Sequence, residues 1–183
     1  MNLSAIKKCC LTEGRFIILN CEGGEQWICN GSSAWPIDGV ELHAGGVPAL
    51  FDLTAKQANE CYIDEHDCED WRFSRTVDRE REQLLEDVGA IWHRGELYRA
   101  AKGDFGTVFL PVSAMKPVKV KDYCEFYARE EDRRLLVAVY PDLFCAALIA
   151  PMDAKTAEAI RTSASIIAAQ QLWLGAEDES EEQ

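Results

Sequence analysis

The stretch Gln26-Trp27-Ile28-Cys29-Asn30-Gly31-Ser32-Ser33-Ala34-Trp35-Pro36-Ile37 is the strongest structural signal in this sequence, because it predicts an antiparallel hairpin. Asn-Gly between apolar runs favours a tight turn, since both residues accept the positive φ angles that such turns require. Pro36 cannot donate a ladder hydrogen bond, so we expect the second strand to lie at a sheet edge or to end near the proline.

Further strands and helices are predicted on both sides of this hairpin. Arg15–Leu19 is a buried strand, and apolar residues at positions 3, 6 and 10 predict a short helix over Leu3–Leu11. Thr54 is a suitable cap for a helix over Ala55–Glu60. Short strands are also predicted at 71–74, 90–93, 96–100, 107–110, 123–129, 135–140 and 144–150.

The C-terminal part predicts a long helix. Asp153 is a good N-cap, and the stripe of Ala157, Ile160, Ala164 and Ile167 continues the apolar face from Ala154 to about Leu174. We therefore expect an α+β fold: a mainly antiparallel sheet with a short N-terminal helix and a long C-terminal helix.

The length favours one compact unit over 1–175, followed by a disordered acidic tail at 176–183. Two related halves, 1–74 and 88–175, are an open alternative because each contains several short strands and some helix. The charged segment 75–87 would then be the connector between them.

Composition and charge restrict the class of protein. Apolar residues make up 48% of the chain, yet no run is long enough to span a membrane, and the N-terminus has no signal-peptide pattern. We therefore expect a cytoplasmic protein whose eight cysteines stay reduced. The net charge of −13 argues against broad binding of DNA or RNA and favours a partner with a basic surface.

Acidic residues concentrate in the polar stretch 60–70, which we interpret as a solvated loop, and in the connector. Spaced carboxylates can occupy a groove that another protein reserves for phosphates. From charge alone, the candidate partner-binding residues are Glu60, Asp64, Glu65, Asp67, Glu69, Asp70, Glu80, Glu82, Glu86 and Asp87.

No pattern fills the roles of an active site. Cys61, His66 and Cys68 have no second pair of ligands at zinc-finger spacing, so a loop with incidental thiols is favoured over a metal centre. A Gly-x-Ser-x-Gly elbow and a phosphate-binding loop are both missing from the sequence. We therefore expect neither enzymatic activity nor a cofactor.

Several short segments of the sequence resemble those of a known group of proteins. They are 2–9, 25–36, Leu50-Phe51-Asp52-Leu53, Phe109-Leu110-Pro111-Val112 and 146–153. The chain resembles small prophage proteins of gut Firmicutes, a group that includes phage-encoded anti-CRISPR inhibitors of type II-A Cas9. The resemblance implies a non-enzymatic protein that binds Cas9, or its complex with guide RNA, and blocks binding or cleavage of target DNA.

Two alternatives remain open. The order of hairpin, Asn-Gly turn and helix also resembles one repeat of a bacterial sliding clamp. This resemblance implies an accessory protein of phage replication or recombination. The second alternative is a metal-dependent nuclease that uses Asp64, Glu65, His66 and Asp67.

Overall fold

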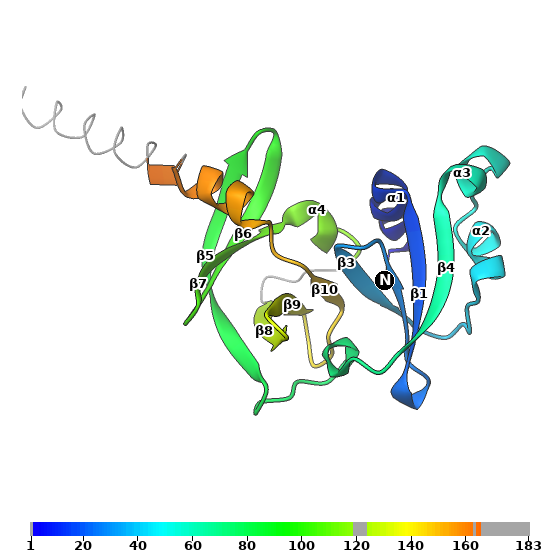
Figure 1. Ribbon diagram of the computed structural model, residues 1–183, viewed down its shortest axis with the longest axis horizontal. Helices are drawn as coiled ribbons and strands as arrows, with labels where there is room; N and C mark the ends of the chain where they lie inside the picture. The colour runs from blue at the N-terminus through cyan, green and yellow to red at the C-terminus, as the bar shows by residue number, and fades with distance from the viewer. Residues whose placement is uncertain (1, 119–123, 163, 166–183) are drawn as a thin grey trace, which may run out of the picture.

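The computed structural model describes residues 2–118, 124–162 and 164–165, and within them ten strands form one curved sheet (Figure 1). The strand order is β4-β1-β2-β3-β10-β9-β8-β5-β6-β7. The strands are β1 (Arg15–Cys21), β2 (Gln26–Cys29), β3 (Ser33–Ile37), β4 (Tyr62–Cys68), β5 (Glu82–His93), β6 (Glu96–Gly103), β7 (Gly106–Pro111), β8 (Glu125–Glu131), β9 (Arg134–Tyr140) and β10 (Ala147–Ile149). The helices with defined bounds are α1 (Leu3–Glu13), α2 (Val47–Leu50), α3 (Ala55–Glu60) and α4 (Val112–Met115).

The predicted α+β fold with a long C-terminal helix is wrong, because the chain is mostly a ten-stranded mixed sheet with short helices. The predicted helix from Ala154 to Leu174 is helical at 154–162 and 164–165, and its remainder lies outside the described residues. The tail predicted at 176–183 also lies outside them. No helix among the described residues is long and apolar enough to cross a membrane.

The hairpin between β2 and β3 is confirmed. Cys29 pairs with Ala34 across the turn, and the Asn30 side chain accepts hydrogen bonds from the backbone amides of Ser32 and Ser33. Of the two alternatives predicted for the second strand, the edge position is wrong, since β3 lies between β2 and β10, and the strand end is confirmed, since β3 ends one residue after Pro36. Pro36 is tolerated there because β10 pairs with β3 only at Ser33 and Ala34, so no partner on that side needs its missing amide.

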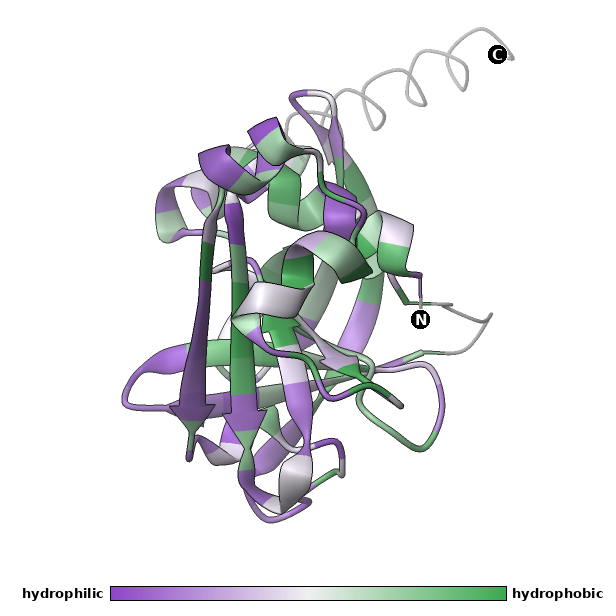
Figure 2. Ribbon diagram, turned by 90° about the vertical axis from the view of Figure 1, so that its right-hand side faces the viewer, coloured by the Kyte–Doolittle hydropathy of each residue, from purple (hydrophilic) through white to green (hydrophobic). Residues whose placement is uncertain are grey.

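The acidic stretch predicted as a loop is instead the edge strand β4, which pairs in parallel with β1 from Tyr62 to Cys68. Every other pairing among the described strands is antiparallel. Figure 2 shows the hydrophilic β4 beside the largely hydrophobic β1. Charged side chains on an edge strand discourage pairing with another chain, so a polar sequence suits this position.

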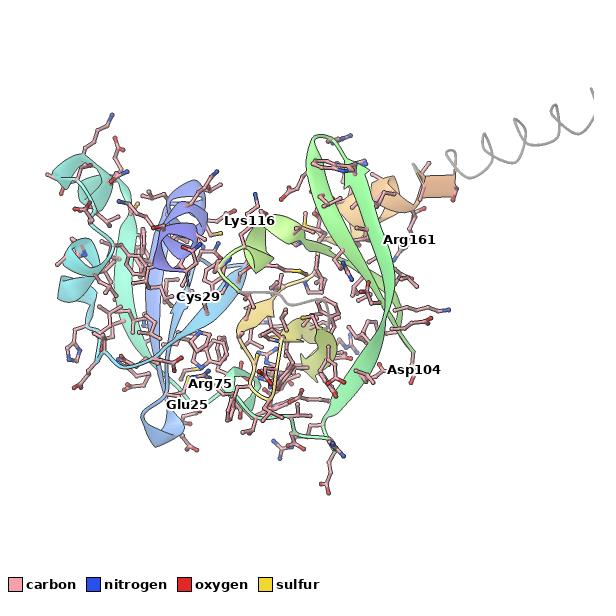
Figure 3. All side chains as sticks on the ribbon, turned by 180° about the vertical axis from the view of Figure 1, so that it is seen from behind. Glu25, Cys29, Arg75, Asp104, Lys116 and Arg161 are labelled. Atoms are coloured by element: carbon pink, nitrogen blue, oxygen red, sulfur yellow. The ribbon has the colours of Figure 1, made fainter. Side chains whose placement is uncertain are left out.

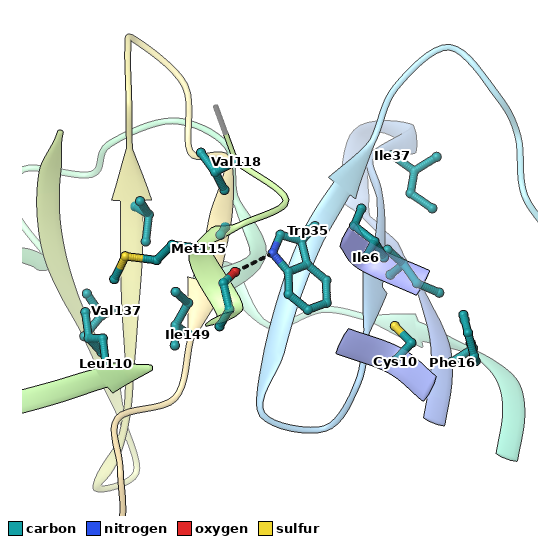
Figure 4. Packing of buried hydrophobic residues seen from close by; sticks show 14 of the residues in the cluster. Ile6, Cys10, Phe16, Trp35, Ile37, Leu110, Met115, Val118, Val137 and Ile149 are labelled. Carbon is teal, nitrogen blue, oxygen red and sulfur yellow. Dashed lines mark hydrogen bonds between the residues drawn. The ribbon is translucent and has the colours of Figure 1, made fainter. Parts of the chain in front are cut away.

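Two helix-and-strand units meet in the middle of the sheet. Helix α1 precedes the antiparallel strands β1-β2-β3, α4 precedes β8-β9-β10, and β3 pairs antiparallel with β10. Both helices lie on the same face, where the Trp35 indole donates to the backbone carbonyl of Ala114 at 3.1 Å (Figure 4). Trp35 is fully buried, so it joins the two units through packing and through this hydrogen bond.

A segment that we call the strap, residues 70–78, covers the opposite face of the sheet, where Phe73 packs edge-on against the buried Trp27. Its start was predicted as a strand at 71–74 but forms a 3-10 turn at Trp71–Phe73. Arg129 of β8 holds the strap by donating to the backbone carbonyls of Ser74 and Thr76, at 2.7 and 3.2 Å. The predicted connector is therefore partly a covering segment and partly, from Glu82, the strand β5.

Candidate functional site: an acidic pole

Carboxylates gather at the end of the sheet where β1 and β4 finish. We call this end the acidic pole and define it by Glu22, Glu25, Glu41 and Glu69. They line two neighbouring cavities of ≈ 250 and ≈ 490 Å³ that share Cys21 and Glu25 and have no lysine or arginine among their described lining residues. Figure 3 places Glu25 at this end of the molecule and Lys116 toward the opposite end.

A tight turn and a pinned loop position these side chains. Gly23 and Gly24 adopt φ angles of 76° and 80° between β1 and β2, and the amide of Cys21 donates to the carbonyl of Glu25 at 2.8 Å. The amide side chain of Gln26 then bonds the backbone of Leu42 in both directions, at 2.7 and 2.9 Å. These bonds hold the loop that carries Glu41 beside the turn that carries Glu22 and Glu25.

Three of the pole carboxylates are not neutralised. No ion pair joins Glu22, Glu25 or Glu69 to a base within the described parts of the chain, while Glu41 lies 3.8 Å from the ring of His43. The neighbouring Asp70 differs, because Arg72 binds it through three hydrogen bonds of 2.6 to 3.0 Å. Burial acts to raise the pKa of Asp70, but the bonds from Arg72 lower it overall.

Glu65 on β4 is held by hydrogen bonds to neighbouring parts of the fold. It accepts hydrogen bonds from the Asn20 side chain at 2.9 Å and the Ala44 amide at 3.0 Å, and lies 3.1 Å from His43. These bonds stabilise the ionised form and lower the pKa of Glu65 to about 2. Glu65 therefore ties the loop at 43–46 to the sheet rather than presenting a free charge.

Burial makes the Cys21 thiol at the acidic pole unreactive. Cys21 and Cys68 are neighbours in the parallel ladder, and all eight cysteines are free. Burial, followed by the neighbouring Cys68, raises the pKa of Cys21 to about 12. Since the thiolate is the nucleophile, Cys21 has little reactivity near neutral pH.

The structure divides the ten predicted acidic residues into separate groups. Glu60, Asp64, Glu65, Asp67, Glu69 and Asp70 follow α3, β4 and the start of the strap, whereas Glu80, Glu82, Glu86 and Asp87 belong to the turn before β5 and to β5 itself. These two groups lie on different parts of the sheet, because six strands lie between β4 and β5 in the strand order. They do not form one continuous surface.

Two members of the second group are engaged internally. The side chain of Glu82 is only 1% exposed and lies 3.0 Å from the guanidinium of Arg129, so its prediction as a surface residue is wrong. Asp87 forms an ion pair with Arg99. The sequence prediction also missed Glu22, Glu25 and Glu41, although the glutamates that flank Gly23-Gly24 were a usable signal, since a turn projects its flanking side chains at one sheet end.

The cysteine and histidine side chains near β4 do not converge. Cys61 precedes the strand, while His66 and Cys68 lie toward its other end. Among the described residues, no three histidine, cysteine, aspartate or glutamate side chains are grouped closely enough to hold a metal ion. Comparison with known proteins adds no assignment, since no family model, no curated protein and no solved structure matches the chain.

Proposed function

We propose that this protein acts without catalysis, by binding Cas9 or its complex with guide RNA in a stoichiometric manner and blocking the binding or cleavage of target DNA. The acidic pole is the surface that makes the contact. Cas9 holds nucleic acid in positively charged channels, and a cluster of unpaired carboxylates complements such a channel. The net charge of −13 supports attraction over longer distances.

The observation that carries the proposal is the set of unneutralised carboxylates around two cavities. Apolar groups accompany them, since Val40 is 51% exposed beside Glu41 and Trp71 lines the cavity that contains Glu69. Protein interfaces combine a polar rim with a few aromatic or aliphatic contacts. The acidic pole has this mixture, and its shape is fixed by short backbone turns.

The experiment is a plasmid-cleavage assay with Cas9 and guide RNA, in which the protein is titrated before and after treatment with EDTA and dialysis. We expect inhibition that saturates near one equivalent and is insensitive to the chelator. Inhibition that disappears after chelation would support the metal-dependent alternative. The absence of inhibition at a large excess would refute the proposal for that Cas9.

Two matched variants locate the contact. Glu22→Gln/Glu25→Gln/Glu69→Gln removes three charges from the acidic pole, while Glu80→Gln/Glu86→Gln/Glu130→Gln removes three exposed charges elsewhere. The change in net charge is identical, so a difference between the variants reports position. We expect the first to weaken inhibition by at least about tenfold and the second by much less. The reverse order would move the contact to the β5 side.

A replication or recombination accessory protein is the second candidate. The observation that favours it is the pair of units α1-β1-β2-β3 and α4-β8-β9-β10, because the sequence resembles one repeat of a sliding clamp. A shift in DNA mobility caused by the protein alone, without Cas9, would favour this candidate over the inhibitor.

A further inference from the structure

A further cavity lies at the opposite end of β2 from the acidic pole, between α1, α4 and the turn that joins β2 to β3. Its volume is ≈ 390 Å³, which falls within the usual range of ligand pockets. The apolar part of its wall comes from three segments of the chain: Ala5 in the first, Pro111 and Ala114 in the second, and Met152 in the third. We call this cavity the interhelix cleft.

Two ammonium groups converge on the interhelix cleft. Lys8 of α1 and Lys116, which follows α4, both line it, and the thiol of Cys9 lies between these elements and donates to the carbonyl of Ser113 at 3.6 Å. Burial raises the pKa of Cys9, and the positive charges of Lys116 and Lys8 partly oppose that rise. Both lysine charges therefore act on the thiol of Cys9, and this thiol stays protonated and uncharged in the wall of the interhelix cleft.

Three carboxylates line the interhelix cleft: Glu96 and Asp153 are satisfied by the protein, whereas Glu13, at the end of α1, is exposed. Glu96 accepts hydrogen bonds from the hydroxyls of Ser113 and Tyr98, at 2.7 and 3.0 Å. Asp153 caps the following helical turn by accepting from the amide of Thr156 at 3.0 Å. Within the described residues, Lys8 and Lys116 take part in no ion pair, so their charge is available to a ligand.

A buried hydroxyl provides an independent sign of a ligand. Ser33 lines the interhelix cleft and is 3% exposed, yet its Oγ has no hydrogen-bond partner in the described part of the chain. Its backbone is fully engaged, since the Ser33 amide donates to the Asn30 side chain and the carbonyl accepts from the Asn30 amide. An unpaired buried hydroxyl is unfavourable, and a polar atom of a ligand in the interhelix cleft supplies its missing partner.

We propose that the interhelix cleft binds a small amphipathic carboxylate, with the anionic group between Lys8, Lys116 and the hydroxyl of Ser33 and the apolar tail against Pro111, Ala114 and Met152. The wall is mainly apolar, so most of the ligand is hydrocarbon, and the two lysines select a negative head group. The inference is independent of the proposed contact with Cas9, because the two sites lie at opposite ends of β2.

Calorimetric titration with decanoate, kept below the concentration at which it aggregates, tests the proposal, and decanol serves as the uncharged comparison. We expect saturable binding of one decanoate per chain and affinity for decanol lower by about tenfold or more. Lys8→Gln/Lys116→Gln weakens decanoate binding by a similar factor. Lys56→Gln/Lys102→Gln, which changes two exposed lysines outside the interhelix cleft, leaves it unchanged.

A third variant tests the cavity itself. Ala5 lies on α1 and is only half-buried, so Ala5→Met preserves the helix while it fills part of the interhelix cleft. We expect decanoate affinity to fall while the unfolding midpoint changes little. No saturable binding of decanoate, equal affinity for decanol, or binding that ignores both the lysine and the Ala5 variants would each overturn the proposal.

Discussion

Replacing Arg129 by methionine is the substitution that tests the architecture most sharply. The Arg129 side chain is fully buried, and the guanidinium lies 3.0 Å from Glu82, whose side chain is 1% exposed. The guanidinium also donates to three backbone carbonyls of the strap, at Arg72, Ser74 and Thr76. Methionine matches the length of the aliphatic stem and removes every one of these donors.

The magnitude follows from what the substitution leaves behind. Glu82 becomes a buried carboxylate without its cation, and removal of one partner of a buried pair typically costs about 3–5 kcal/mol. The strap carbonyls lose their donors as well, so we expect the upper part of that range. Because whole domains have stabilities of about 5–15 kcal/mol, this single change removes about a third or more of the free energy of unfolding.

The assay is urea unfolding at neutral pH, followed by tryptophan fluorescence, for Arg129→Met, Glu82→Gln and the double variant. The double variant is expected to be more stable than the sum of the single losses predicts, by about 1–3 kcal/mol, because the neutral glutamine removes the buried charge. A loss below about 1 kcal/mol for Arg129→Met, or strict additivity, would refute the reasoning that this ion pair holds the strap.

Three further predictions concern acid, thiols and the hairpin turn. The pKa of Glu65 is lowered to about 2, so the ionised carboxylate stabilises the fold fully at a pH above the ordinary pKa of glutamate, and this stabilisation is lost as the pH falls toward 2. Glu65→Gln should therefore flatten the dependence of the urea midpoint on pH in that window. Cys10 and Cys145 are fully buried, so a thiol reagent should label them only after unfolding. Gly31 has a φ angle of 100°, so Gly31→Ala should cost about 1–2 kcal/mol in thermal unfolding.

Elements governed by neighbouring residues were predictable from the sequence. Asn30 forms the hairpin turn through its own side chain, and Thr54 caps α3 through reciprocal hydrogen bonds with Gln57 three residues later. Each interaction lies within one turn of chain, so the sequence pattern contains both partners. The α1 helix is similarly closed by Gly14 in the left-handed conformation.

Elements governed by distant partners were not predictable. The acidic run of β4 becomes a strand only because β1, more than forty residues earlier, offers a free parallel edge. The sequence around Glu82 predicts a surface residue, but its side chain is buried because it pairs with Arg129 in another strand. Sequence patterns describe local preference, and such preferences are overridden when a pairing far along the chain supplies the missing hydrogen bonds or charge.

The same distant pairings decide what the charges can do at the surface. The segment around the strap contains an arginine concentration that a DNA-encircling clamp would need as a basic face, yet Arg72 pairs with Asp70, Arg75 with Asp38 and Arg81 with Asp78. Each ion pair is neutral overall, so the net negative charge of the protein comes from carboxylates elsewhere on the molecule. The acidic pole is one place where carboxylates have no neighbouring base. Neutralising its glutamates therefore tests the proposed contact surface more directly than the net charge of the chain does.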